Sequence, residues 1–413
     1  MTQKRNDSKT KRYFAIIGTL DTKGPETAFL RDCLRALGWK TKIVDVGLLS
    51  SPTFRPHVTR EEIAQKAGTT LEALLRGKGG KVEAIESMVR GATLVLSDWV
   101  QSGEIAGVIA IGGGVGTWLA TAVMRALPLG LPKVMVSTIP FQDIRPLLGT
   151  QDIVLFPSVV DILGLNPLLR MILQHAAGAL VGMTNLPPME SKEKRVIGIT
   201  SLGITTPAVL ASREILESQG FEVTCYHANG YGGRAFEEGI AAGMFSAVLD
   251  LTTHEITNQL FNGLGIASPN RLETAGRAGI PQVVAPGGVD VISRGPIDTL
   301  RPSEEKKPYY RHSPFFTHVR ASPRQMRKVG ELMAEKLNLS CGPCVVAIPL
   351  RGFSDQNRPD GLFYDPQADG EFISTLKKKV NPRIRLVEID AHINDKVFAR
   401  RICQLLGEIM EAR

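Results

Sequence analysis

The sequence lacks the features that mark membrane, secreted and nucleic-acid-binding proteins. No apolar run reaches 18 residues, so the sequence predicts no membrane-spanning helix. Aromatic residues make up only 6% of the chain, and they are not interleaved with basic residues as on nucleic-acid platforms. The polar, basic opening over residues 1–12 has no apolar core, so it predicts a disordered tail and not a secretory signal. We therefore expect a cytoplasmic protein without a membrane or nucleic-acid partner.

Cysteine is scarce. The 413 residues include five cysteines, an odd number that is typical of a reducing compartment. Cys341 and Cys344 have the spacing of a thioredoxin redox motif, which normally follows a strand and opens a helix. Here a helix predicted over 324–339 precedes the pair, and a strand predicted over 345–348 follows it. Because this order is reversed, the sequence favours a structural interpretation of the pair.

Three common functional motifs are missing. The chain has no GxxxxGK[ST] phosphate loop, and the glycine turn over 112–117 fails GxGxxG at its last position. His254 and Glu255 begin an HExxH pattern, but Asn258 stands where the second histidine is required. These absences exclude a P-loop nucleotidase and a zinc protease of the HExxH type, and no other metal-ligand motif is predicted.

The chain does contain a repeat of domain size. A strand, a helix and a strand over 13–46 recur in the same order over 196–226, and Pro25 and Pro207 stand at corresponding helix starts. The repeat predicts an α/β fold of two Rossmann-like doubly wound parallel-sheet subdomains in tandem. We expect a charged, proline-bearing loop over 301–312. The predicted tail, N-terminal domain, linker and C-terminal domain are 1–12, 13–185, 186–194 and 195–413.

The most informative stretch is Val108 to Thr117, in which an apolar run enters three consecutive glycines before an apolar, helix-like segment. The run predicts a buried parallel strand. Glycines allow close backbone approach, and the following helix offers free N–H groups and its positive dipole end to an anion. The stretch therefore favours a phosphate or carboxylate site. A tight strand-to-helix turn without a ligand is the alternative.

Ligands of open α/β sheets bind beyond the carboxyl ends of the strands. In the first half, those ends suit a phosphorylated ligand: glycines cradle it, Lys23 neutralises charge, and Asp21 holds Mg²⁺ or a ribose hydroxyl. A solvated loop lysine is an equal alternative for Lys23. The predicted nucleotide-binding residues are Gly18, Thr19, Asp21, Thr22, Lys23, Gly112, Gly113, Gly114, Gly116, Thr117, Ser137 and Thr138.

The second half has its own group of polar residues at predicted strand ends. Arg234 is expected to bind an anionic substrate in a bidentate way, and His227 or a carboxylate to transfer a proton. For each residue alone, a helix cap or a structural salt bridge is an equal alternative. The predicted catalytic residues, expected to share one cleft, are His227, Arg234, Asp250, Glu255 and Asp290.

Several strings in the chain resemble one family, the tomato-mosaic-virus-resistance-like ATP-binding proteins of bacteria, fungi and plants. The resemblance implies two Rossmann-like subdomains, ATP binding in the N-terminal one, and a homodimer. It also implies that a plant member inhibits a viral replication protein. The sequence departs from the family pattern over 139–142 and 155–157. The strings that carry the resemblance are 18–24, 111–117, 130–138, 160–166, 227–234, 276–284 and 392–395.

Three functions follow from these observations. The first is a cytoplasmic ATP-binding protein with its nucleotide cleft in the N-terminal half, with or without Mg²⁺. The second is an enzyme that acts on a small carboxylated or phosphorylated metabolite in the C-terminal half. The third is an inhibitory or scaffolding module that binds a protein. The sequence does not decide between an enzyme and a binding protein.

Overall fold

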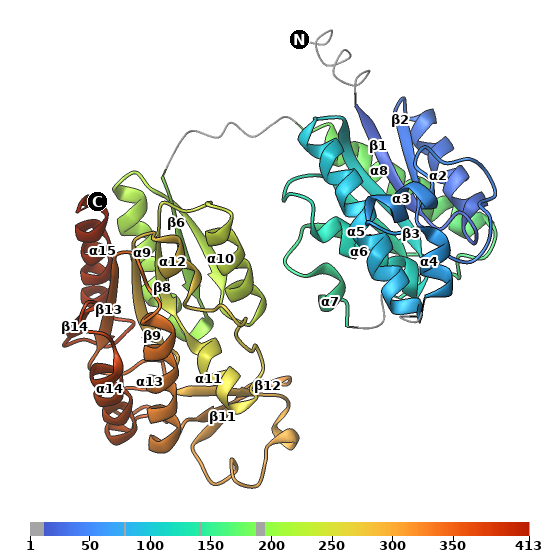
Figure 1. Cartoon of the computed structure of the whole chain (residues 1–413). Coiled ribbons are helices and arrows are strands. Elements are labelled where there is room, and N and C mark those ends of the chain that lie inside the picture. The colour runs from blue at the N-terminus through green and yellow to red at the C-terminus, as the bar shows by residue number, and fades with distance from the viewer. Residues whose placement is uncertain (1–11, 78–79, 140–142, 187–194, 413) are drawn as a thin grey trace. The chain divides into compact units, whose positions relative to one another are not determined.

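The computed structural model describes residues 12–77, 80–139, 143–186 and 195–412. The chain divides into two compact units, Met1–Met189 and Glu190–Arg413 (Figure 1). The division falls inside the predicted linker, of which residues 187–194 lie outside the described residues, as do residues 1–11 of the predicted tail. Each unit has its own hydrophobic core and is described by itself.

The N-terminal unit is built on a five-stranded parallel sheet with the order β2-β1-β3-β4-β5. The central strand β3 is buried at every position, as the apolar run from Val108 predicts, and it begins three residues before that run. The strands are β1 (Tyr13–Gly18), β2 (Lys40–Asp45), β3 (Ile105–Gly112), β4 (Lys133–Ser137) and β5 (Ile153–Pro157).

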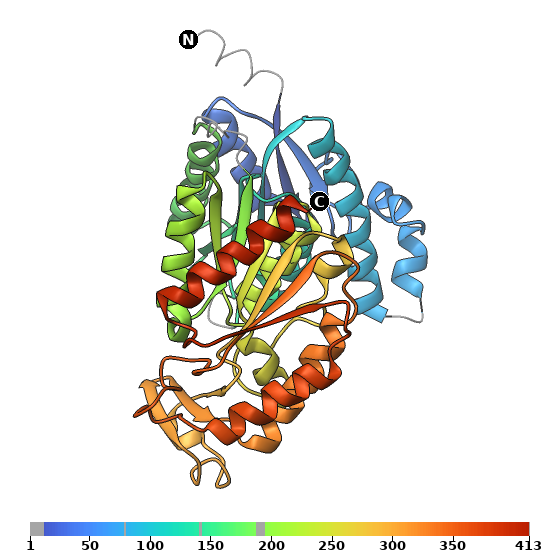
Figure 2. The same ribbon diagram turned by 90° about the vertical axis from the view of Figure 1, so that its left-hand side faces the viewer.

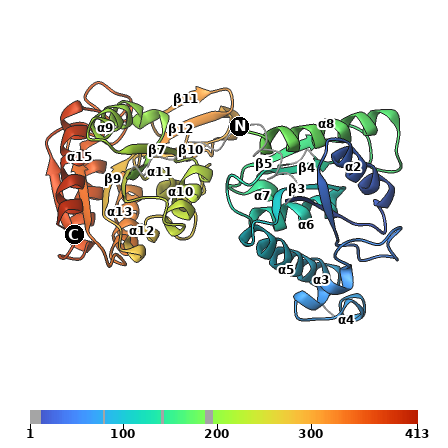
Figure 3. The ribbon, with the colours of Figure 1, turned by 90° about the horizontal axis from the view of Figure 1, so that it is seen from above.

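Helices cover both faces of this sheet (Figure 3). On one face, α2 (Gly24–Ala36) and α8 (Pro167–Thr184) pack against each other and against β1, β3 and β4. On the other face lie α3 (Arg60–Lys66), α5 (Gly80–Gln101) and α6 (Gly114–Arg125). Two short helices complete the unit, α4 (Leu71–Arg76) and α7 (Arg145–Leu148).

The C-terminal unit repeats this order with one further strand. Its six parallel strands run β14-β13-β9-β8-β6-β7, so β6, β7 and β8 correspond to β1, β2 and β3. Both units are therefore Rossmann-like, as predicted. The strands are β6 (Val196–Ser201), β7 (Glu222–His227), β8 (Ala247–Thr252), β9 (Gln282–Gly287), β13 (Cys344–Pro349) and β14 (Arg385–Ile389).

The second sheet is also covered on both faces. Helices α9 (Thr206–Ser218) and α15 (Lys396–Glu411) pack on one face, and Figure 2 shows α15 in red crossing the strands. The other face is covered by α10 (Tyr231–Ala241), α11 (His254–Phe261), α12 (Thr274–Ala278), α13 (Pro323–Leu337) and α14 (Pro366–Lys379). Single-turn 3₁₀ helices occur at η1 (Gly203–Thr205) and η2 (Ile297–Thr299).

A small antiparallel sheet is inserted between β9 and α13. It has the order β10-β12-β11 and consists of β10 (Val291–Arg294), β11 (Tyr309–Ser313) and β12 (Phe316–Arg320). The predicted loop over 301–312 is therefore wrong for its last four residues, which belong to β11. β11 is an edge strand with exposed polar side chains at Arg311 and His312, so it lacks the apolar run of a buried strand. Across the described ranges, no helix is long and apolar enough to cross a membrane.

Candidate functional site

The order β2-β1-β3 places a topological switch point between β1 and β3 of the N-terminal unit. In open α/β sheets the ligand crevice lies at such a point, outside the carboxyl ends of the strands. A cavity of about 310 Å³ lies there, at the lower end of the range for small-molecule sites. Of the predicted nucleotide-binding residues, it is lined by Thr19, Asp21, Thr22, Lys23, Gly113, Gly114 and Gly116.

The glycine turn gives this cavity its backbone donors. Gly113 is the N-cap of α6, and the first intrahelical bond runs from Thr117 N to Gly113 O at 2.8 Å. The amides of the first three helical residues, 114–116, therefore have no intrahelical acceptor. A Cβ on Gly114 would meet no atom within 4 Å, and one on Gly113 only Thr138 Oγ1 at 3.7 Å. The turn is open toward the cavity, as an anion site requires.

The loop after β1 adds a cation and a carboxylate. Lys23 is one of the residues that line the cavity, and its ammonium group donates to the carbonyl of Ile162. Asp21 Oδ2 accepts from Leu49 N at 2.7 Å, which fixes the loop after β2, while Oδ1 is buried and has no partner among the described residues. Asp21 therefore keeps one carboxylate oxygen for a donor or a cation.

Asp45, at the end of β2, binds the backbone of this loop and of the loop after β2. Its Oδ1 accepts from Leu20 N at 3.0 Å and from Gly47 N at 2.9 Å. Burial raises the pKa of this carboxyl group above its usual value, despite those two donors. Asp45 was not among the predicted site residues, although a carboxylate at the end of a predicted strand is a usable signal.

The other five predicted nucleotide-binding residues do not line the cavity, and four of them shape the turn behind it. Thr117 Oγ1 lies 2.8 Å from Ser137 Oγ, and both side chains are fully buried. A Cβ on Gly112 would lie 2.7 Å from the carbonyl carbon of Gly116, so this glycine is required by the tight turn. Thr138 N donates to Gly112 O at 3.3 Å. The fifth residue, Gly18, lies at the end of β1, where a Cβ would lie 2.7 Å from the hydroxyl oxygen of Thr27 on α2.

One wall of the cavity was not predicted. It consists of apolar side chains from the loop after β2, from α5 and from α6, with Lys81 at the start of α5 beside them. These residues reach the site only through the parallel pairing of β1 with β2 and through the packing of α5, which no local pattern indicates. The apolar members are Val46, Leu48, Leu49, Ile85, Val115 and Leu119.

In the C-terminal unit, Asp250 and Glu255 converge on a buried arginine that the sequence analysis missed. Arg271 is fully buried, forms a bidentate pair with Asp250 and donates to Glu255 Oε2 at 2.7 Å and Glu237 Oε1 at 3.3 Å. Burial alone lowers the pKa of Arg271, but the charge of Asp250 raises it well above its ordinary value. Burial also raises the pKa of Glu237. The group joins β8 to α10 and α11.

The remaining predicted catalytic residues lie in other surroundings. His227 is exposed at the end of β7, and Arg234 is 58% exposed and pairs with Glu238 on its own helix at 2.9 Å. Asp290 is fully buried in the turn after β9 and accepts from Ser354 Oγ at 2.6 Å. The five side chains therefore divide among three surroundings. Arg271 binds the two predicted carboxylates Asp250 and Glu255, whereas Arg234 pairs with its helix neighbour Glu238.

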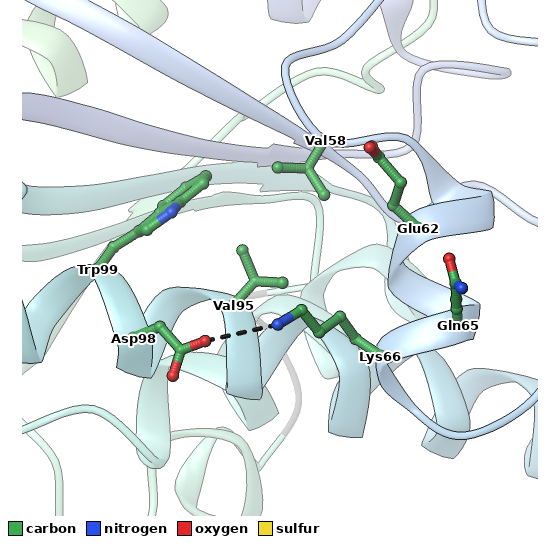
Figure 4. Close-up of a pocket in the computed structure, with 7 residues that line it drawn as sticks. All are labelled: Val58, Glu62, Gln65, Lys66, Val95, Asp98 and Trp99. Atoms are coloured by element: carbon green, nitrogen blue, oxygen red, sulfur yellow. Dashed lines mark ion pairs between the residues drawn. The ribbon is translucent and has the colours of Figure 1, made fainter.

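A larger hollow, of about 580 Å³, lies between α3 and α5 (Figure 4). Its lining residues include Val95 and Trp99, and none of them is a glycine. Its Lys66 and Asp98 are both more than half exposed and pair with each other at 3.7 Å. A surface hollow of this kind lacks the backbone donors of the switch-point cavity, so we do not regard it as the main site.

The cysteine pair lies where the sequence analysis predicts, after α13 and at the start of β13. Cys341 is exposed, whereas Cys344 is buried, and burial raises the pKa of its thiol to about 12. A catalytic thiol needs a lowered pKa. The environment of Cys344 therefore favours the structural interpretation.

Comparison with known proteins identifies the family. The chain matches both domains of the uncharacterised protein family UPF0261. Residues 12–188 match its N-terminal domain, and residues 194–410 match its C-terminal domain. A UPF0261 protein of Clostridium tetani is 40% identical over 398 residues, which cover 96% of this chain and 98% of that protein. The ToMV susceptible protein tm-1(GCR26) of Solanum lycopersicum is 32% identical over 419 residues, covering 96% of this chain and 55% of that protein.

The comparison with solved structures gives no information about a ligand. The UDP-GlcNAc 2-epimerase of Methanocaldococcus jannaschii is 9% identical, with 97% of this chain and 93% of that chain covered, at a TM-score of 0.21. At that score the match supports no inference about a ligand. The two family domains match both units, and the bacterial and plant relatives cover nearly the whole sequence; the chain therefore belongs to the UPF0261 family.

Proposed function

We propose that this protein binds ATP in the switch-point cavity of its N-terminal unit. The observation that carries the proposal is the open turn at the N-terminus of α6, where the amides of residues 114–116 face a cavity that also contains two lysines. A helix N-terminus preceded by glycines is a general solution for binding phosphate. The resemblance to ATP-binding proteins supports the same ligand.

Different residues around the cavity suit the phosphates, the base and the ribose of a nucleotide. The turn amides would hold phosphate oxygens, and Lys23 and Lys81 would balance their charge. The apolar wall, including Leu48 and Ile85, would contact the base, since such rings bind mainly by apolar contact. Asp21 Oδ1, buried and unpartnered among the described residues, would accept from a ribose hydroxyl or bind Mg²⁺.

When bound, ATP supplies a transferable phosphoryl group. The contribution of the protein is to bind and orient it: the fixed turn amides need no rearrangement, and the Ile162 carbonyl holds the ammonium group of Lys23. Binding without turnover would suit a sensor or scaffolding protein, and turnover would suit an enzyme.

Calorimetric titration of the full chain with ATP tests the proposal. Lys23→Met should weaken ATP binding about tenfold or more, because it removes a charged contact worth about 1.5–3 kcal/mol. Lys378→Met is the matched control, since Lys378 is an exposed lysine on α14 of the other unit. Equal ATP affinity in the two folded variants would contradict the proposed role of the cavity.

We also propose that the chain forms a homodimer, which the family resemblance implies. Sedimentation velocity over a range of concentrations measures this directly. A single monomeric species throughout would contradict it.

A further inference from the structure

The C-terminal unit contains a second group of polar residues, separate from the Arg271 group. We call it the Asp290 cluster and define it as Asp290, Tyr310, Arg320, Asp355, Asn357 and Asp369. These residues come from the turn after β9, from β11 and β12, from the loop after β13 and from α14. The inserted antiparallel sheet thus brings two of its strands to the carboxyl edge of the main sheet.

A small apolar core fixes the position of the cluster. Ile204, Val291 and Phe363 form this core, and Tyr310 packs against it. Asp290 directly precedes Val291, and the backbone amide of Asp355 donates to Ile204 O at 3.2 Å. Ile204 follows β6, which adjoins β8 at the switch point of this sheet. The cluster therefore lies where an α/β sheet of this order binds ligands.

Negative charge exceeds positive charge within the cluster. It contains three carboxyl groups and one guanidinium group, and Arg320 is committed to Asp369 at 2.6 Å and to the Phe363 carbonyl at 2.8 Å. Asn357 Nδ2 also donates to both oxygens of Asp369, at 3.1 and 3.0 Å. Asp369 is therefore paired with a cation. Burial raises the pKa of Asp290, and the charge of Arg320 partly offsets this, but neither Asp290 nor Asp355 forms an ion pair among the described residues.

A separate observation concerns unpartnered oxygens. Asp290 and Asn357 are both 0% exposed, and each has one side-chain oxygen, Oδ1, that accepts no hydrogen bond from any residue in the described ranges. Asp355 Oδ1 is buried and unpartnered in the same way. A buried acceptor left without a donor costs about 1–3 kcal/mol, and more when it is charged. Acceptors from three side chains are thus available to the donors of a bound group.

The surroundings favour an ammonium group over a metal ion. The rings of Tyr310 and Phe363 lie 5.4 Å apart, and the Tyr310 ring lies 5.3 Å from that of His318. Burial lowers the pKa of His318 to about 3, so this ring is neutral and adds no competing charge. Aromatic rings beside carboxylates are typical of sites for organic cations. In the ranges that the structure describes, no group of three His, Cys, Asp or Glu side chains is arranged to hold a metal.

We propose that the C-terminal unit has a second binding site, in which Asp290 and Asp355 bind the ammonium group of an amine ligand beside the ring of Tyr310. The carboxylate oxygens accept its N–H donors, and the ring contacts the adjoining carbon. This site is independent of the ATP site in the other unit, so either proposal can fail alone.

Nuclear magnetic resonance of ¹³C-methylammonium chloride, titrated with the full chain at constant ionic strength, tests the site. Methylammonium is small enough for any ammonium site, and tetramethylammonium, which has no N–H donor, is its control. We expect the wild type to broaden the methylammonium resonance and to leave tetramethylammonium unchanged. Asp290→Asn and Asp355→Asn should each abolish the broadening, while Asp390→Asn should retain it, because Asp390 is exposed and paired with Arg351.

Three outcomes would overturn the proposal. The first is no broadening by the wild type, which would indicate that Asp290 is simply protonated. The second is equal broadening by Asp355→Asn, a folded variant at a partly exposed position. The third is displacement of methylammonium by equimolar Mg²⁺, which would make the site a metal site. Lys23→Met should bind methylammonium like the wild type, which separates this test from that of ATP binding.

Discussion

Gly113→Val is the substitution that most specifically blocks the proposed ATP site. Gly113 has φ −77° and ψ −160°, an extended conformation that valine adopts without strain. Its Cβ would meet only Thr138 Oγ1, at 3.7 Å, so the folded protein has room for the new side chain. Since valine is a poorer N-cap than glycine, we expect a loss of about 1 kcal/mol in the free energy of unfolding.

The effect on ATP should be much larger. The isopropyl group would stand in front of the amides of residues 114–116, which the proposal assigns to phosphate oxygens. Each lost hydrogen bond to a charged group costs about 1.5–3 kcal/mol, which corresponds to about tenfold to 100-fold in the dissociation constant. Blocking two such bonds should make binding undetectable by calorimetry at ordinary protein concentrations.

Two variants control for changes in folding. Gly178→Val places the same side chain on α8 of the same unit, where a Cβ meets nothing within 4 Å, and it should bind ATP normally. Gly112→Ala should instead destabilise the fold, because its Cβ would lie 2.7 Å from backbone atoms. If a folded Gly113→Val protein binds ATP as tightly as the wild type, the assignment of the turn to phosphate is wrong.

Three further predictions concern the C-terminal unit. Arg271→Met should lower the free energy of unfolding by about 3–5 kcal/mol in urea titrations, because it leaves three buried carboxyl groups without their cation. Arg234→Ala, at an exposed ion pair, should lower it by less than about 1 kcal/mol, and similar losses in the two variants would refute the structural role of Arg271. Replacing Cys341 and Cys344 together by serine should leave ATP binding unchanged, whereas a reversible disulfide between them in the thioredoxin range of potential would contradict the structural interpretation. Burial lowers the pKa of His254 from 6.5 to about 4. As the pH drops from 6.5 to 4, His254 takes up a proton in the unfolded state but not in the folded state, so the free energy of unfolding should fall over this range. The loss attributable to this residue is about 3 kcal/mol, and a His254→Gln variant with the same pH dependence as the wild type would rule it out.

The parts of the fold that follow from local patterns could be predicted from the sequence. The apolar run into the glycines at 112–114 predicts β3, the turn and α6, and the repeat after residue 195 predicts the second sheet. The loop Thr19 to Lys23 was placed at the cavity because parallel strand ends share one edge. Each of these inferences depends on residues that are near one another in the chain.

The parts that depend on distant contacts could not be predicted. Lys81 and Leu48 reach the cavity through helix packing and strand pairing, and neither position has a local signature. Arg271 lies in a turn-rich segment, and nothing nearby indicates that three carboxyl groups will surround it. Arg234 was the more conspicuous candidate, yet Glu238, one helical turn later, was a visible signal for an exposed pair.

Amide hydrogen exchange of the full chain, with and without ATP, tests the central claim most directly. Bound phosphate should slow exchange at the amides of residues 113–116, and contact with the nucleotide should slow it at residues 19–23 and in the loop at 46–49. The C-terminal unit should show no such protection. Protection by ATP that is confined to the C-terminal unit, or that spares residues 113–116, would contradict the proposed site.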